Sequence, residues 1–507
     1  MRERTTAKMK NAILRLSALL CAVCLLAGIP LAQAADGFDY AYTYTYDYWG
    51  DLRQSPDAYR VKSFLTSADL GLDKQMVNPS GLFVQGDDIY VVDTGNNRII
   101  QLHHDNGTYT VTRYIDSFTG DVEPLTFNGP QDIYVEENGT MYIADTANNR
   151  ILKLDKDLNY IQSFLKPSDA TFDQELSYLP TKLVADVSGR VFALAQNVNK
   201  GLIKYEADAT FTGFIGASPV KYTWYELIWR LISTKEQRAQ QSSFVPTEYD
   251  NIAIDEKGFF YVVTQTFDEN ELMGGGAEPV RRLNSLGTNI LIENGNWWVV
   301  GDVQWAAGDS NLSRTGPSKF VDITVLDNDI YVALDETHNR LFGYDHQGNM
   351  LWAFGGLGNA VGYFNKPSAL EHMGYDLLVL DSQAAALTIM TPTTYGQQIY
   401  EATELYDRGE YDASADTWLE VLKQNGNYDL AYIGIGRAKL QQGEYKEACD
   451  YFKMARDAKN YSEAFRYYRS ELVEQNIGWI FGVVAVLLVV PMIIGRIKKI
   501  KWEVENS

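Results

Sequence analysis

The sequence predicts a mainly β protein, in which six small antiparallel sheets form a ring that is followed by a helical arm and one transmembrane helix. Three observations support this prediction. A unit of short strands and tight turns recurs six times within residues 58–393 of the 507-residue chain. Apolar residues then take up helical spacing from residue 395, and a charge-free apolar stretch occupies residues 477–495. Repeats of this size and strand content are typical of a β-propeller.

The repeat is clearest in two nearly identical copies. IYVVDTGNNRII occupies Ile89–Ile100, and MYIADTANNRIL occupies Met141–Leu152. Each copy has a β-branched and aromatic run, a polar turn and a second apolar run, which is the pattern of a β-hairpin. One strand before and one strand after complete a sheet of four. Further copies begin near residues 180, 250, 321 and 367.

The last copy has too few strands for a complete blade. It reaches only three strands by Thr393, whereas an unused strand, Tyr59–Phe64, precedes the first copy. We expect this early strand to become the outer strand of the last blade, because ring closure lets every sheet bury both faces.

The turns of the repeat resemble those of a known family. The Asp-x-x-Asn-Asn-Arg segments Asp93–Arg98 and Asp145–Arg150 resemble the NHL repeat, and in the fifth copy we place Asp335 one residue late. The resemblance covers about residues 58–393 and implies a six-bladed NHL-type β-propeller, in which these side chains are mainly structural. The residues assigned to the motif are Asp93, Asn97, Arg98, Asp145, Asn149, Arg150, Asn339 and Arg340.

The N-terminal 57 residues contain two distinct segments. Residues 1–34 have a basic start, an apolar stretch and Ala32-Gln33-Ala34, which predict a cleaved signal peptide, with an uncleaved anchor helix as the alternative. Residues 35–57 are rich in tyrosine, with one at every second position from Tyr40 to Tyr48. This alternation predicts a strand with one tyrosine face. That face packs on the propeller or contacts a carbohydrate or peptide.

Residues 395–476 predict a helical arm. Gly409-Glu410-Tyr411 and Gly443-Glu444-Tyr445 are separated by about 34 residues, which is the period of tetratricopeptide repeats. The arm therefore resembles two such repeats and a final helix. A peptide-binding groove and a stalk between propeller and membrane are both consistent with it, and the shortness of the arm favours the stalk.

The apolar stretch Ile477–Gly495 is about 28 Å long as a helix, which matches a bilayer core. Arg496, Lys498, Lys499 and Lys501 follow it directly. The positive-inside rule places the tail, residues 496–507, in the cytoplasm and the bulk of the chain outside. The sequence thus predicts a single-pass type I protein of the cell membrane.

Composition limits the classes of partner and site. The formal charge of −22 disfavours nucleic acid, since an acidic protein repels phosphate backbones. Removal of the signal leaves Cys449 alone, so an internal disulfide is excluded. None of the five histidines recurs at an inner position shared by several blades. We therefore expect no metal site and no cofactor.

One mouth of the central channel is the main candidate for ligand binding. Aligning the copies puts these residues in one column: Gly81, Asp132, Lys182, Asn251, Asp322 and Ala369. With the neighbouring Asp250, the four polar side chains of the column could bind a polar ligand or a cation. A solvated channel lip, in which Lys182 balances the acidic groups, is the alternative.

Three tryptophans, Trp297, Trp298 and Trp305, lie in a segment between blades. Their rings could stack on sugars, or they could plug the loop. The leading functional interpretation is a membrane-anchored extracytoplasmic scaffold that presents the propeller and arm to a protein partner, such as a transport or envelope complex. The alternatives are a lactonase- or lyase-type enzyme at the acidic channel mouth and a carbohydrate-binding sensor. On balance we do not expect an enzyme.

Overall fold

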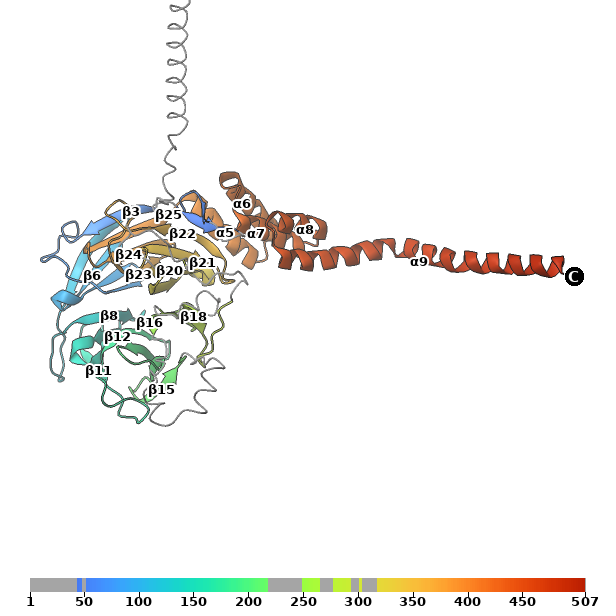
Figure 1. The fold of residues 1–507 in the computed structure, drawn as a ribbon. Coiled ribbons are helices and arrows are strands. Elements are labelled where there is room, and N and C mark those ends of the chain that lie inside the picture. Colours follow the sequence, from blue (N-terminus) through green and yellow to red (C-terminus); the bar gives the residue numbers. More distant parts are fainter. Residues whose placement is uncertain are drawn as a thin grey trace, which may run out of the picture.

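The computed structural model describes residues 43–47, 52–217, 249–264, 277–292, 301–302 and 317–506. The predicted signal peptide and the three loop tryptophans lie outside these ranges. Within them, six antiparallel sheets surround a common axis, and a helical arm leaves one side of the ring (Figure 1). This confirms the prediction of a six-bladed propeller followed by helices.

Each sheet is one blade; the strands of blades one to four follow in chain order from the inside outwards, and blades five and six have N-terminal strands at their outer edge. Blade one consists of β4 (Gly81–Gln85), β5 (Asp88–Asp93), β6 (Arg98–Asp105) and β7 (Thr108–Ile115). Blade two consists of β8 (Pro130–Val135), β9 (Met141–Asp145), β10 (Arg150–Leu154) and β11 (Tyr160–Phe164). Blade three consists of β12 (Pro180–Ala185), β13 (Val191–Ala195), β14 (Leu202–Tyr205) and β15 (Phe211–Ile215).

The second half of the ring is less regular. The described part of blade four has β16 (Tyr249–Ile254), β17 (Phe260–Thr264) and β18 (Val280–Leu283). Blade five has β19 (Phe320–Val325), β20 (Tyr331–Asp335), β21 (Arg340–Tyr344) and β22 (Met350–Gly355). Blade six has β23 (Pro367–Met373), β24 (Asp376–Asp381), β25 (Ala386–Pro392) and the early strand β3 (Tyr59–Thr66).

The ring closes as the strand count predicts. β3 pairs antiparallel with β25, from Thr66 opposite Ala386 to Tyr59 opposite Pro392. The innermost strand of every blade contacts the innermost strands of both neighbours, and β23 of blade six contacts β4 of blade one. Each of the six interfaces between blades holds its own buried apolar cluster. Closure therefore covers both faces of every sheet.

The tyrosine-rich segment extends blade five. β1 (Tyr44–Tyr46) pairs with β22, and β2 (Leu52–Gln54) pairs with β1, so this sheet has six strands. Tyr44 is fully buried against Phe342, with the two ring centroids 6.5 Å apart. The predicted tyrosine strand is confirmed for the described residues, and Tyr44 packs on the propeller.

The arm is a stack of antiparallel helices: α5 (Thr394–Asp407), α6 (Tyr411–Gln424), α7 (Asp429–Gln441), α8 (Tyr445–Met454) and α9 (Ala458–Glu505). Gly409 and Gly443 both have φ +81° at the turns between paired helices. This left-handed conformation is easy only for glycine. Gly434 of α7 lies against the Trp418 ring of α6, so a small residue there allows the helices to approach closely.

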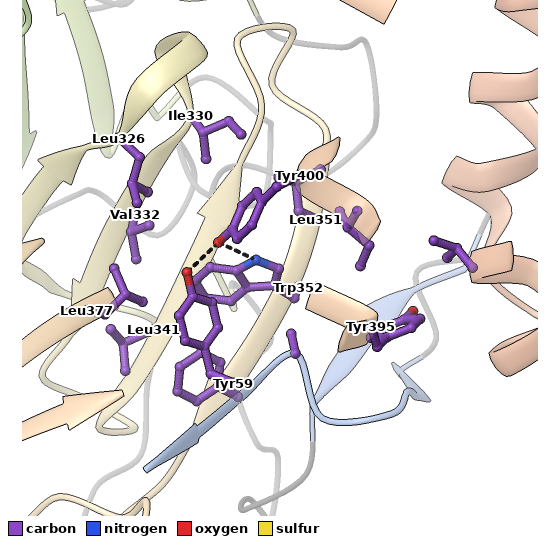
Figure 2. Packing of buried hydrophobic residues seen from close by; sticks show 14 of the residues in the cluster. Tyr59, Leu326, Ile330, Val332, Leu341, Leu351, Trp352, Leu377, Tyr395 and Tyr400 are labelled. Carbon is purple, nitrogen blue, oxygen red and sulfur yellow. Dashed lines mark hydrogen bonds between the residues drawn. The ribbon is translucent and has the colours of Figure 1, made fainter. Parts of the chain in front are cut away.

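The arm and the propeller share one apolar core. Tyr59 of β3 and Trp352 of β22 lie in the same buried cluster as Tyr400 of α5 (Figure 2). The Tyr400 hydroxyl is 2.7 Å from the Tyr59 hydroxyl and accepts a hydrogen bond from Trp352 Nε1 at 3.1 Å. Tyr428, which precedes α7, donates to the Leu351 carbonyl at 2.7 Å. The arm therefore docks rigidly on blades five and six.

α9 is a single 48-residue helix that projects away from the rest of the molecule (Figure 1). It contains the predicted apolar stretch, which is long and apolar enough to cross a membrane. None of that stretch is buried inside the protein.

Candidate functional site

The strand-end aspartates organise the NHL-like turns. Asp93 is fully buried at the end of β5, where its Oδ1 accepts from the Val77 amide at 2.8 Å. Its Oδ2 accepts from Asn96 Nδ2 and Arg98 Nε, both at 2.8 Å. Asn97 sits at φ 55° and closes the turn in a left-handed conformation.

Asp145 repeats this arrangement in blade two. Its carboxylate accepts from the Asn128 amide at 2.8 Å, from Asn148 Nδ2 at 2.9 Å and from Arg150 Nε at 2.8 Å. Asn149 has φ 57°. A carboxylate that ties a preceding loop, the turn and the next strand together has a structural role, in agreement with the resemblance.

The placement of Asp335 one residue late was wrong. Asp335 pairs directly with Arg340 across β20 and β21, as Asp93 pairs with Arg98. His338 takes the place of the first asparagine and lies 2.8 Å from the Asp335 carboxylate. Asp381 of blade six also holds this position and accepts from the Asn365 amide at 2.6 Å. The missed signal was the aspartate that ends the second strand of blades one, two, five and six.

Blade five uses the motif arginine differently. Arg340 is buried and donates to Asp302 and to the Tyr44 hydroxyl, the latter at 3.0 Å. Tyr44 in turn donates to Asp302 Oδ2 at 2.9 Å. This network joins the N-terminal strand to blade five. Burial raises the pKa of the Tyr44 hydroxyl most, and the negative charge of Asp302 raises it further.

The channel-mouth column forms contacts between blades. Asp132 Oδ2 of blade two accepts from the Leu183 amide of blade three at 2.9 Å. Asp322 Oδ2 of blade five accepts from the Leu370 amide of blade six at 2.7 Å. Asn251 of blade four donates to Asp322 Oδ1 at 2.5 Å. The innermost strands have no further strand on the channel side, so these side chains satisfy their exposed backbone groups.

Lys182 lies among the acidic groups. Its Nζ is 3.8 Å from Asp132 Oδ1. Within the described part of the chain, this ammonium donates no direct hydrogen bond. Burial lowers the pKa of Lys182, but the carboxylates, Asp132 first, raise it by more, so the net pKa is above its ordinary value. The predicted residues Asp132, Lys182, Asn251 and Asp322 thus share one electrostatic environment, and Asp250 acts on the same ammonium.

Two carboxyl groups of this ring titrate close to neutral pH. Burial raises the pKa of Asp132 to about 6 and that of Asp322 to about 7, although the Lys182 charge opposes both shifts. Because ligand-binding and catalytic groups often have such perturbed pKa values, the ring remains the strongest candidate for a small-ligand site.

Aligning the six copies of the repeat did not identify Glu371 and His372 of β23 as residues of the channel mouth. Glu371 acts electrostatically on Asp132, Lys182 and Asp322. Thr324 Oγ1 lies 3.2 Å from Glu371 Oε2 and 2.7 Å from His372 Nδ1. Glu371 follows the column position Ala369 by two residues, so strand alternation could have identified it.

The described residues contain no group of three or more His, Cys, Asp or Glu side chains arranged to hold a metal ion. Asp132 and Asp322 belong to blades on opposite sides of the ring, so their carboxylates do not form such a group with Asp250. The ring is thus a hydrogen-bonded and ion-paired arrangement of single side chains from different blades.

No protein-family model matches the chain. It is 26% identical over 165 residues to the NHL repeat-containing protein 3 of Mus musculus. The chain resembles an NHL-repeat protein. The match covers 30% of this chain and 44% of the mouse protein, so the chain spans less than half the length of the curated relative it matches. With the six-bladed ring, this similarity supports an NHL-type propeller.

Part of the chain aligns with several solved structures. Virginiamycin B lyase from Staphylococcus aureus is 11% identical with a TM-score of 0.37, covering 65% of this chain and 98% of that one. A protein of unknown function from Bacteroides thetaiotaomicron is 9% identical with a TM-score of 0.40, covering 69% and 76%. These values are too low to carry an argument about function.

Proposed function

We propose that the protein is a membrane-anchored extracytoplasmic scaffold that holds its propeller at a fixed position for a protein partner of a membrane or envelope complex. The observation that supports this most directly is the continuous core between propeller and arm. Tyr59, Trp352 and Tyr400 belong to one buried cluster, and the arm leads directly into the apolar helix.

The ends of the apolar stretch support membrane insertion. Trp479, near the start of the stretch, is 79% exposed, and Trp502, beyond Gly495 among the basic residues of the tail, is 66% exposed. Tryptophans favour the two interfaces of a bilayer, whose hydrocarbon core is about 30 Å thick. The basic residues after Gly495 favour a cytoplasmic C-terminus.

The docking of the arm favours a stalk over a peptide clamp. α5 and α7, the first helices of the two pairs, both face the propeller: Tyr400 contacts β3 and β22, and Arg437 of α7 donates to Gln347 of blade five. A groove lined by these helices is therefore occupied by the propeller wall.

Membrane fractionation with alkaline carbonate extraction, combined with protease treatment of intact cells, tests this function. We expect the full chain to stay in the pellet, the propeller to be digested from outside, and a chain ending at Asn476 to be released. Crosslinking in native membranes followed by mass spectrometry should then recover a membrane or envelope protein. Extraction of the full chain by carbonate, or an undigested propeller, would contradict the anchoring and the orientation.

A second function, binding of a small polar ligand at the channel mouth, is favoured by the Lys182 ammonium, 3.8 Å from Asp132. A ligand oxygen could lie between these two groups. If the protein were a lactonase- or lyase-type enzyme, its substrate would bind at this channel mouth. If it were a carbohydrate sensor, the sugar would bind at the segment with Trp297, Trp298 and Trp305. Purified protein screened against polar metabolites by thermal shift should give a hit that Lys182→Met abolishes. A hit that survives in the variant would place the ligand elsewhere.

A further inference from the structure

Negative charge is in excess among the described side chains of the channel mouth. Lys182 of blade three lies among four carboxylates from four other blades, those of Asp132, Asp322, Asp250 and Glu371. One ammonium cannot neutralise four carboxylates once all of them are ionised. Because charges inside a protein are stable when they are paired, this ring favours a ligand that brings a further positive charge.

Glu371 of blade six lies close to the axis of the ring. Its charge acts on Asp132 of blade two, on Lys182 of blade three and on Asp322 of blade five. A side chain that acts on groups of three other blades projects into the channel rather than towards one neighbouring sheet. The Glu371 side chain is 20% exposed and that of Lys182 is 13% exposed, so both are accessible from the channel.

Two aromatic rings line the channel near this carboxylate. Phe83 and Tyr134 lie two positions after their blades' residues in the aligned column, so strand alternation turns them to the same side. Their ring centroids are 4.9 Å apart, and both side chains are partly buried. The Glu371 charge also acts on Tyr134, so the carboxylate and the two rings face the same part of the channel. Aromatic faces attract organic cations.

Lys182 provides a second contact for a ligand. Its Nζ lies 3.8 Å from Asp132 Oδ1, and within the described residues this ammonium donates no direct hydrogen bond. A hydroxyl or carbonyl oxygen of a ligand can accept from it. A ligand carboxylate would instead be repelled by the carboxylates that surround Lys182. The ring therefore suits a molecule that combines one ammonium group with one uncharged oxygen acceptor.

We propose that the channel mouth binds a small organic ammonium compound, whose cationic group lies between Glu371 and the Phe83 and Tyr134 rings and whose hydroxyl or carbonyl oxygen accepts from Lys182. This assignment rests on the proposed ligand site at the channel mouth and gives the class of its ligand. A metal ion fits less well, because it requires several oxygen ligands that converge on it at about 2.0–2.6 Å. No three His, Cys, Asp or Glu side chains of the described residues are arranged in that way.

Binding of an organic cation should strengthen as pH rises. Burial raises the pKa of Asp132 to about 6 and that of Asp322 to about 7, so both carboxyl groups ionise across this range and attract the cation. The charged groups that face both of them are Lys182 and Glu371. Burial lowers the pKa of His372, and the neighbouring Glu371 carboxylate raises it by more. Loss of the positive charge of His372 at rising pH acts in the same direction.

Isothermal titration calorimetry of the full chain in detergent, with choline as the probe, tests the ligand class. Choline carries a positive charge that does not depend on pH and one hydroxyl group, and 3,3-dimethylbutan-1-ol is its uncharged analogue of the same shape. We expect choline to bind about tenfold more tightly at pH 8 than at pH 5.5, because the carboxyl groups ionise between these values. The uncharged analogue should bind at least about tenfold more weakly than choline at pH 8.

Variants place the cation within the channel. Glu371→Gln should weaken choline binding about tenfold, and Tyr134→Leu should weaken it about threefold through loss of the ring face. Tyr134→Phe keeps the ring and should bind choline as the unmodified chain does. Glu401→Gln, at an exposed position of α5, is the control for removal of a carboxylate and should leave binding unchanged. The thermal unfolding curve of each variant shows that it still folds.

The outcomes separate the ligand class from the ligand site. Equal binding of choline and its uncharged analogue, an affinity for choline that does not rise with pH, or choline binding that Glu371→Gln leaves unchanged would overturn the ammonium assignment. A neutral or anionic metabolite that binds only when Lys182 is present, while choline does not bind, would also overturn it but leave the site intact. If neither choline nor any screened metabolite binds, the site and the assignment are both refuted.

Discussion

At the residue scale, the repeated aspartates matter because each satisfies several buried donors at once. Asp145 is fully buried and pairs with Arg150, whose side chain is 4% exposed. Both charges are removed from water, so each depends on the other. The similarity of the turns in blades one, two and five thus reflects a shared need to fix the hairpin and the loop before it.

Asp145→Ala should therefore lower the free energy of unfolding by about 3–5 kcal/mol, because it leaves the Arg150 charge buried without its carboxylate. Denaturant unfolding of the full chain in detergent, followed by circular dichroism, measures this loss. The exposed Asp157→Ala is the control and should change the free energy by less than about 0.5 kcal/mol. Equal effects of the two variants would show that the buried pair has no special role.

The channel carboxyls predict a pH dependence of stability. The folded-state pKa of Asp322, about 7, exceeds its unfolded value of about 3.9, so the folded protein binds the extra proton between these values. The stability contributed by this group is complete below pH ~4 and is lost as pH rises to about 7. Asp132, with a pKa of about 6, acts in the same direction.

Asp322→Asn should remove the larger part of this dependence, because asparagine cannot ionise. Relative to the unmodified chain, the variant should gain on the order of 3 kcal/mol between pH 4.5 and pH 8. Urea unfolding at several pH values checks the slope. A difference between the two proteins that stays constant with pH would refute the raised pKa.

At the element scale, the paired helices of the arm depend on glycines that face aromatic rings. A Cβ on Gly434 would lie 2.7 Å from Trp418 Cδ1, and one on Gly436 would lie 2.7 Å from Phe452 Cε1. The large residues Trp418 and Phe452 occupy equivalent positions in the two helix pairs. The period of the arm is therefore maintained by matched small and large residues across each helix interface.

Gly434→Ala should destabilise the arm by about 1–3 kcal/mol through overpacking, although alanine is the better helix former by about 1 kcal/mol. Hydrogen exchange of the α6 and α7 amides should therefore increase. Gly426→Ala, whose new Cβ would have its nearest neighbour 3.9 Å away, is the matched control and should leave exchange unchanged. Slower exchange in Gly434→Ala would mean that helix propensity outweighs the contact with Trp418.

At the scale of the whole molecule, propeller and arm should unfold together. Trp352 is fully buried between β3 and α5, and its indole donates to Tyr400 (Figure 2). The core on either side of this residue is continuous, so neither part can open without exposing it. Such coupling would keep the orientation of the propeller fixed relative to α9.

Trp352→Ala should cost about 3–5 kcal/mol and raise hydrogen exchange in both β22 and α5, because one cavity would weaken both parts. Hydrogen exchange with mass spectrometry resolves the two elements. The exposed Leu286→Ala should leave both unchanged. Increased exchange in α5 alone would indicate that the arm opens independently of the ring.

The sequence by itself determined the number of blades, the strand that closes the ring and the apolar helix. These features follow from local periodicity and turn chemistry, which act within a few residues, as in Asp93–Arg98. Only the tertiary structure decided that Arg340 pairs with Asp302 and Tyr44, that Glu371 joins the channel ring, and that Tyr400 docks on Tyr59. These contacts join segments from different blades, from the N-terminal strands and from the arm. No local period encodes them, because they depend on how the closed ring brings distant strands together.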